Sequence, residues 1–141
     1  NNTKDPEKFF EDVPLSLPAL AHAVKVQKKA SQLNFDWTNS SEVLSKINEE
    51  VKELWHACET NKKIYIEEEF GDVLFSIVNL GRKLDVDPEK SLGVSIKKFK
   101  KRIRESIKLI KAEKVSDKHL TDKKLHEIWE HAKDLLKKND I

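Results

Sequence analysis

The sequence has few of the residues that interrupt helices or close tight turns. Its 141 residues include 3 glycines and 4 prolines, too few to turn a many-stranded sheet. Methionine is absent, and the single cysteine, Cys58, has no partner in the chain for a disulfide. No segment resembles a signal peptide or approaches the roughly 20 apolar residues that span a bilayer. The sequence therefore predicts a helical protein of the reducing cytoplasm, without a membrane segment.

Charged residues are abundant, at 37%, close to the 38% of apolar residues. This balance suits thin helices that each bury one stripe rather than a thick sandwich. The net charge is only +2, but acids crowd residues 42–72 and bases crowd residues 97–111. The chain begins Asn1-Asn2, so we expect a piece of a longer protein.

The pattern of apolar residues predicts an N-terminal arm over 1–16 and an all-α domain over 17–141. A first helix is expected from Pro18 to near residue 33. Asn39 and Glu42 form a capping box for a second helix, and Asn61 is a plausible C-cap before a third. A fourth helix is expected from Asp87 and a fifth from near residue 122. Together they predict a bundle of four to five helices around a central antiparallel hairpin.

Asp72 is the residue in this pattern whose burial would cost the most free energy. Residues 70–81 are otherwise apolar or small, apart from Ser76 and Asn79. An unpaired carboxylate buried among them would cost several kcal/mol. Asp72 therefore predicts a partner, which could be a basic side chain, another cation or a metal ion.

Three further acids are placed to join Asp72. Glu69 precedes it by three residues, and Glu50 and Glu53 have the same spacing on the preceding helix. A hairpin turn at Asn61 would set Glu53 beside Glu69 and Glu50 beside Asp72. Two carboxylates about 4 Å apart repel by roughly 4 kcal/mol at an effective dielectric of 20. Four oxygen donors predict Mg²⁺, or Mn²⁺ as a substitute, and favour more than one ion with a phosphate-bearing ligand.

Two other interpretations of these acids remain open. Glutamates on helices often face solvent, which is a reasonable interpretation of Glu49, Glu67 and Glu68. The stretch Glu53-x-x-His56 matches half of a di-iron carboxylate site. A second Glu-x-x-His stretch is missing from the sequence, which argues against that site.

The paired acids also resemble a known signature. Glu49-Glu50-x-x-Glu53, a gap of 15 residues and then Glu69-x-x-Asp72 are similar to the motif of MazG-type nucleotide pyrophosphohydrolases, within the all-α NTP pyrophosphatase superfamily. Similarity extends from about Phe9 to Lys137. The flanking stretches that carry it are Leu17-Pro18-Ala19-Leu20, Gln27-Lys28-Lys29-Ala30, Phe35-Asp36-Trp37, Glu68-Glu69-Phe70-Gly71-Asp72-Val73-Leu74-Phe75, Val78-Asn79-Leu80 and Lys98-Phe99-Lys100-Lys101-Arg102.

The resemblance implies Mg²⁺-dependent hydrolysis of nucleoside triphosphates to a monophosphate and pyrophosphate, with a metal-activated water attacking the α-phosphorus. A catalytically weak domain that binds nucleotides or regulates a partner is the alternative. The resemblance also assigns residues of this chain to three roles: binding Mg²⁺, orienting the attacking water and contacting the substrate. The implied metal ligands are Glu50, Glu53, Glu69 and Asp72, the water-orienting acid is Glu49, and the substrate contacts are Lys46, Asn79, Lys98, Arg102 and Trp129.

Three features bear on partners. Tyr65 occupies a place where some members of the family carry lysine, so one phosphate contact could be missing or supplied elsewhere. The basic run at 97–104 could bind nucleic acid, but such a run is more often a solvated helix face, and no nucleic acid is expected. Short helices with wide apolar stripes, together with Trp37 and Trp129, predict that a homodimer completes the core, which the resemblance also implies.

Overall fold

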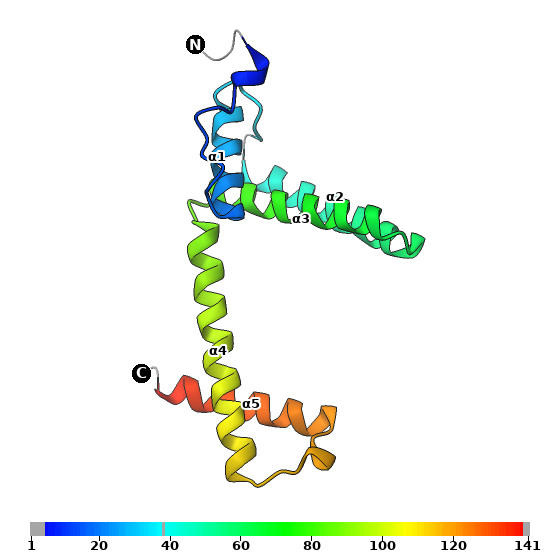
Figure 1. Cartoon of the computed structure of the whole chain (residues 1–141), viewed down its shortest axis with the longest axis vertical. Helices are drawn as coiled ribbons and strands as arrows, with labels where there is room; N and C mark the ends of the chain where they lie inside the picture. Colours follow the sequence, from blue (N-terminus) through cyan, green and yellow to red (C-terminus); the bar gives the residue numbers. More distant parts are fainter. Residues whose placement is uncertain (1–4, 38, 140–141) are drawn as a thin grey trace. The chain divides into compact units, whose positions relative to one another are not determined.

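The protein is all-α in the computed structural model, which describes residues 5–37 and 39–139 (Figure 1). Its five α-helices and two short 3₁₀ turns account for all the regular structure in this described part, which contains no strand. The sequence-based prediction of an all-helical fold is confirmed. The helices are α1 (Ala19–Ser31), α2 (Ser40–Thr60), α3 (Lys63–Lys83), α4 (Pro88–Ala112) and α5 (Asp122–Asn139), and the 3₁₀ turns are η2 (Pro6–Lys8) and η3 (Asp117–His119).

The chain forms two compact units, with the boundary between Ser91 and Leu92. The first unit contains α1, α2, α3 and the first turn of α4; the second contains the rest of α4 and α5. Within the first unit, α2 packs along α3 and α1 packs on α3 (Figure 1). The proposed limit between an arm over 1–16 and a domain over 17–141 remains a prediction.

The central hairpin forms where the sequence predicts it, because local chemistry fixes both ends of α2. The side chain of Asn39 accepts a hydrogen bond from the Glu42 amide at 2.9 Å, which caps the helix start. Asn61 ends α2 in the left-handed region, at φ 56°, a conformation that asparagine tolerates better than most residues. Two residues later α3 begins, so the two helices run antiparallel.

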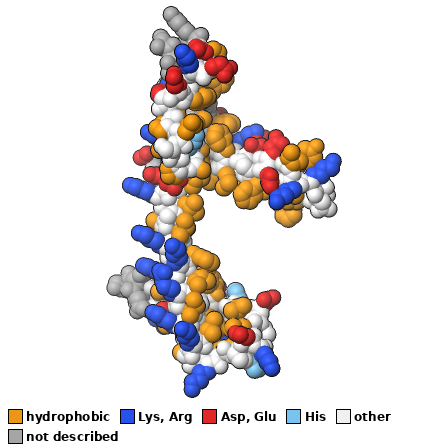
Figure 2. Space-filling view, viewed as in Figure 1, with side chains coloured by type: hydrophobic (Ala, Val, Ile, Leu, Met, Phe, Trp, Pro, Cys, Tyr) orange, Lys and Arg blue, Asp and Glu red, His pale blue; other side chains and the backbone are white. Residues whose placement is uncertain are grey.

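The buried apolar core is small in each unit. In the first it comprises Val13, Val43, Ala57 and Val78, and in the second Ile128 and Ala132. Many apolar side chains on the hairpin and, separately, along α4 lie on the surface (Figure 2). An apolar helix face is buried only where another element covers it. Since α1 and α2 cover only part of the surface of α3, the apolar side chains on the rest of α3 are exposed.

Two expectations about burial were therefore wrong. Cys58 continues the apolar spacing of Val51 and Leu54, which predicts that it packs inside, but it is exposed. The neighbours of Asp72 were expected to be core residues, but Phe70 is 55% exposed and Leu74 is 44% exposed. Asp72 itself is exposed.

In the described residues no helix combines the length and the apolar character that a bilayer span requires.

Candidate metal centre

The hairpin brings three of the four predicted ligands together. Oxygen atoms of Glu50, Glu69 and Asp72 all lie within 4.8 Å of one another. Glu50 comes from α2, and the other two come from successive turns of α3. Because α2 and α3 run antiparallel from the turn at Asn61, residues at equal distances from the turn meet side by side. The predicted pairing of the two acidic stretches therefore occurs.

The fourth predicted ligand, Glu53, lies beside Glu69 but outside the group of three. The two carboxyl groups are close enough to share a hydrogen bond when one of them is protonated. Both line a shallow hollow of about 290 Å³ that Tyr65 also lines. Tyr65 thus lies beside these acids, at the position where the resemblance implies a lysine in some members of the family.

The degree of burial differs among these acids in a way that the sequence did not reveal. Glu50 is 6% exposed, Glu69 is intermediate and Asp72 is exposed. The costly buried carboxylate is therefore Glu50 on α2 rather than Asp72 on α3. The reason is that Glu50 lies on the side of α2 that carries the buried Val43 and Ala57, at spacings of seven residues.

The electrostatics of this group favour a bound cation. Burial raises the pKa of the Glu69 carboxyl above its usual range, and Glu53, Asp72 and Glu50 raise it further. One oxygen of Glu50 and one of Glu69, Oε2 in both, are buried and accept no hydrogen bond from the described residues. Buried polar atoms are normally satisfied. A hard divalent cation such as Mg²⁺ or Mn²⁺ fits this set of oxygen donors.

Lys46 is the basic side chain that contacts the group. Its Nζ lies 2.9 Å from Oε1 of Glu50 and 3.8 Å from Oε2 of Glu49. The hydrogen bond to Glu50, followed by the charges of the nearby acids, raises the pKa of Lys46 above its usual range. Glu49, the predicted water-orienting acid, is exposed. The predicted contact of Lys46 with phosphate remains a prediction.

Asn79 belongs to a network that the sequence did not reveal. Its side chain is 2% exposed, and its Oδ1 accepts a hydrogen bond from Nη1 of Arg82 at 3.2 Å. Arg82 and Lys83 both donate to Asp36 at 2.8 Å. Asp36 stands in the stretch Phe35-Asp36-Trp37, but its partners lie 46 and 47 residues away. Nothing in local spacing could have predicted these pairs.

The remaining predicted substrate contacts lie in the second unit. The guanidinium of Arg102 lies 5.8 Å from the centre of the Trp129 ring, and Phe99 lies on the same indole with ring centres 5.7 Å apart. Lys98, one turn before Arg102, is exposed. Arg102 and Trp129 therefore form one cluster, and the joint action of Lys98, Arg102 and Trp129 with the acids of the first unit remains a prediction.

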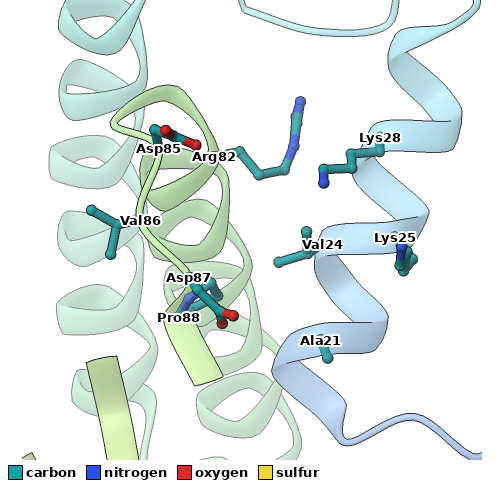
Figure 3. A pocket seen from close by; sticks show the side chains of 9 residues that line it. All are labelled: Ala21, Val24, Lys25, Lys28, Arg82, Asp85, Val86, Asp87 and Pro88. Carbon is teal, nitrogen blue, oxygen red and sulfur yellow. The ribbon is translucent and has the colours of Figure 1, made fainter. Parts of the chain in front are cut away.

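A larger hollow, of about 460 Å³, lies between α1 and the end of α3 (Figure 3). Figure 3 shows Lys28 and Arg82 reaching into the space between the two helices. Asp85 and Asp87 line the same space. Its lining includes none of the acids described above, so the hollow and the candidate metal centre are separate features of the first unit.

Removal of the charge of Glu69 tests the electrostatics of the centre. A carboxyl whose pKa is raised by folding favours the folded state at low pH, and that contribution is lost as the pH rises through the raised pKa. Glu69→Gln should therefore melt at a higher temperature than the wild type when both are treated with chelator at pH 7. In the wild type, Mg²⁺ at about 100 times its Kd should raise the free energy of unfolding by about 2.7 kcal/mol.

Melting curves with chelator and with Mg²⁺ measure both effects. Glu68→Gln removes an exposed glutamate of the same helix and should behave as the wild type does. Equal melting temperatures for Glu69→Gln and the wild type in chelator, with equal responses to Mg²⁺, would contradict the expectation.

Comparison with known proteins identifies relatives over most of the chain. The sequence model of the MazG nucleotide pyrophosphohydrolase domain matches residues 38–107. The chain is 45% identical over 130 residues to the nucleoside triphosphate pyrophosphohydrolase/pyrophosphatase MazG of Thermotoga maritima. These 130 residues make up 92% of this chain and 49% of the relative. The chain is 34% identical over 126 residues to the nucleoside triphosphate pyrophosphohydrolase of Escherichia coli K12, covering 88% of this chain and 48% of the relative. The chain thus spans about half the length of these relatives.

Proposed function

Since residues 38–107 of this chain belong to the MazG family, we propose that it hydrolyses nucleoside triphosphates to a nucleoside monophosphate and pyrophosphate, with Mg²⁺ as the cofactor and Mn²⁺ as a substitute. The two bacterial relatives are nucleoside triphosphate pyrophosphohydrolases by name, which supports the activity. The observation that carries the proposal is the group of carboxylate oxygens from Glu50, Glu69 and Asp72 within 4.8 Å of one another. A cytoplasmic location, favoured by the lone cysteine, belongs to the same proposal.

In the first unit, Glu50, Glu69 and Asp72 would hold the cation, with Glu53 completing the set from beside Glu69. When bound, a divalent cation acidifies water and neutralises charge on phosphate oxygens. Glu49 is exposed and lies next to Glu50 in the sequence, where its carboxylate would orient the water that attacks the α-phosphorus. Without a cation, four carboxylates would repel a triphosphate.

The other proposed residues would act on the substrate. Lys98 and Arg102 would bind the phosphates, since both carry positive charge one turn apart on α4. The indole of Trp129, already paired with Arg102, offers a flat surface for a base. Asn79 is buried and accepts a hydrogen bond from Arg82, and its contact with the substrate remains a prediction.

A panel of canonical and damaged nucleoside triphosphates, assayed with Mg²⁺ for monophosphate and pyrophosphate separately, tests the activity. Equal amounts of monophosphate and pyrophosphate are expected from at least one nucleotide, and none in chelator. Release of inorganic phosphate alone would contradict cleavage between the α and β phosphates. Binding of nucleotide without any product would support the alternative, a catalytically weak module that binds nucleotides or regulates a partner.

We also propose that two copies of the chain associate through their exposed apolar surfaces. On α3, Phe75 is 46% exposed and Ile77 is 47% exposed, and the neighbouring Leu74 is similar. A monomer rarely leaves so many large apolar side chains uncovered on one helix. A symmetric dimer that covers them would supply the core that a single chain lacks.

Sedimentation at micromolar concentration should therefore give a mass near twice 16.4 kDa. Ile77→Asp should shift the protein to the monomer mass, because it places a charge on the apolar surface. Lys52→Asp, on an exposed position of α2, is the matched control and should leave the mass unchanged. A single species of 16.4 kDa for the wild type would overturn the dimer.

A further inference from the structure

The ion pair between Lys46 and Glu50 uses one of the two oxygens of a buried carboxylate and leaves the other without a partner among the described residues. Oε1 accepts from the ammonium of Lys46 at 2.9 Å, whereas Oε2 is buried and has no hydrogen-bond partner among the described residues. Oxygens of Glu69 and Asp72 lie within 4.8 Å of an oxygen of Glu50. A cation held by these three acids would therefore share the Glu50 carboxylate with the ammonium group.

Two cations on one carboxylate repel each other, and the repulsion is strong where water is excluded. Lys46 is one turn before Glu50 on α2, and it has a second acid, Glu49, at 3.8 Å. The ammonium group thus offsets part of the negative charge of the acids when no other cation is present. The same positive charge opposes the uptake of a divalent ion.

A polyphosphate changes this balance. A triphosphate carries several negative charges, and its oxygens accept the same charge-assisted hydrogen bonds from an ammonium group that a carboxylate accepts. The Lys46 side chain is 35% exposed, and one of its two acidic partners, Glu49, is 64% exposed. The ammonium group therefore has room to turn outward. If a phosphate takes the ammonium, Glu50 becomes available to the divalent ion with both of its oxygens.

We infer that Lys46 is an internal counter-ion of Glu50 whose transfer to the nucleotide couples nucleotide binding to metal binding. The inference rests on the proposed function and adds that the affinity for the metal depends on the nucleotide. The divalent ion binds weakly alone and tightly together with the phosphates. Coupling of this kind is reciprocal, so the metal strengthens nucleotide binding by the same factor.

Calorimetric titration of the chelator-treated full chain with Mn²⁺ tests the inference. Lys46→Gln should bind Mn²⁺ about tenfold more tightly than the wild type in the absence of nucleotide, a change within the usual range of coupling between sites. Lys46→Arg keeps the charge and should bind as the wild type does. Lys52→Gln removes an exposed lysine of the same helix and should also leave the affinity unchanged.

The second arm repeats the titrations with a nucleoside triphosphate whose α–β bridging oxygen is replaced by methylene, after correction for Mn²⁺ bound by the free analogue. The analogue should raise the Mn²⁺ affinity of the wild type by about tenfold and that of Lys46→Gln by much less. Circular dichroism checks that each variant is folded.

The outcomes separate the two proposals. If the wild type binds Mn²⁺ and releases pyrophosphate, but Lys46→Gln binds Mn²⁺ with equal or lower affinity, the counter-ion role is overturned and the proposed function stands. If the wild type takes up no Mn²⁺ and releases no product, both fail.

Discussion

Replacement of Asp72 by asparagine is expected to lower kcat/KM for nucleoside triphosphates about 10²–10³-fold, the loss typical of removing one group that stabilises charge at a reaction centre. The amide keeps the shape of the side chain but loses its negative charge. Oxygens of Glu50 and Glu69 would then have to hold the cation with one anionic partner fewer. Helix content should stay as in the wild type, because Asp72 is exposed in the chain. Kinetics with varied Mg²⁺, together with circular dichroism, measure both quantities.

Glu68→Gln is the matched control for this substitution. Glu68 is exposed on the same helix, and its loss of charge should change kcat/KM by less than about a factor of two, as surface substitutions usually do. Full activity of Asp72→Asn at low Mg²⁺ would remove Asp72 from the metal centre. A loss of activity accompanied by a loss of helix would show that the substitution acts on folding instead.

Asp36→Asn is expected to give the largest change in stability, a loss of about 3 kcal/mol, at the lower end of the range for breaking a buried ion pair. The aspartate is the shared partner of two cations, and the side chains of Arg82 and Lys83 are 10% and 20% exposed. The substitution would leave both charges without an anion. Nε of Arg82 is already buried without a partner, so the arginine has little alternative. Denaturant unfolding measures the change.

The dependence of this effect on pH follows from the pKa of Asp36. Burial opposes its ionisation, but the hydrogen bond from Lys83 and the charges of Arg82 and Lys83 hold its pKa below its usual range. A lowered pKa contributes stability that is present above the usual carboxyl pKa of about 4 and is lost as the pH falls below it. The difference between wild type and variant should therefore shrink as the pH falls from about 4 toward 2.

Asp12→Asn breaks a second aspartate–cation pair and is the control. Asp12 accepts from Lys29 at 3.0 Å, but its side chain is 58% exposed, and exposed ion pairs contribute little. The expectation for Asp36 fails if the two substitutions destabilise the protein equally.

The helices and the acid pairing could be predicted because their determinants are local. Asn39 caps α2, Asn61 turns the hairpin, and the spacing of Glu50, Glu53, Glu69 and Asp72 about that turn sets which carboxylates meet. These features depend on neighbouring residues, on helical periodicity and on one antiparallel turn.

Burial and long-range pairing could not be predicted in the same way. Whether Glu50 or Asp72 is buried depends on which side of each helix the other covers. The partners of Asp36 lie 46 and 47 residues further along the chain. The apolar side chains of α3 predicted a buried helix. Several of them are exposed, because the sequence does not say which faces of a helix a second element covers.

The central claim is that carboxylates of α2 and α3 together hold a divalent cation. Titration of chelator-treated wild-type protein and of Glu50→Gln with Mn²⁺ tests it most directly, in the presence of the methylene-bridged nucleotide. Saturable uptake by the wild type that is lost in Glu50→Gln is the predicted result. Uptake that is identical in both proteins, or absent from the wild type at millimolar Mn²⁺, would contradict it.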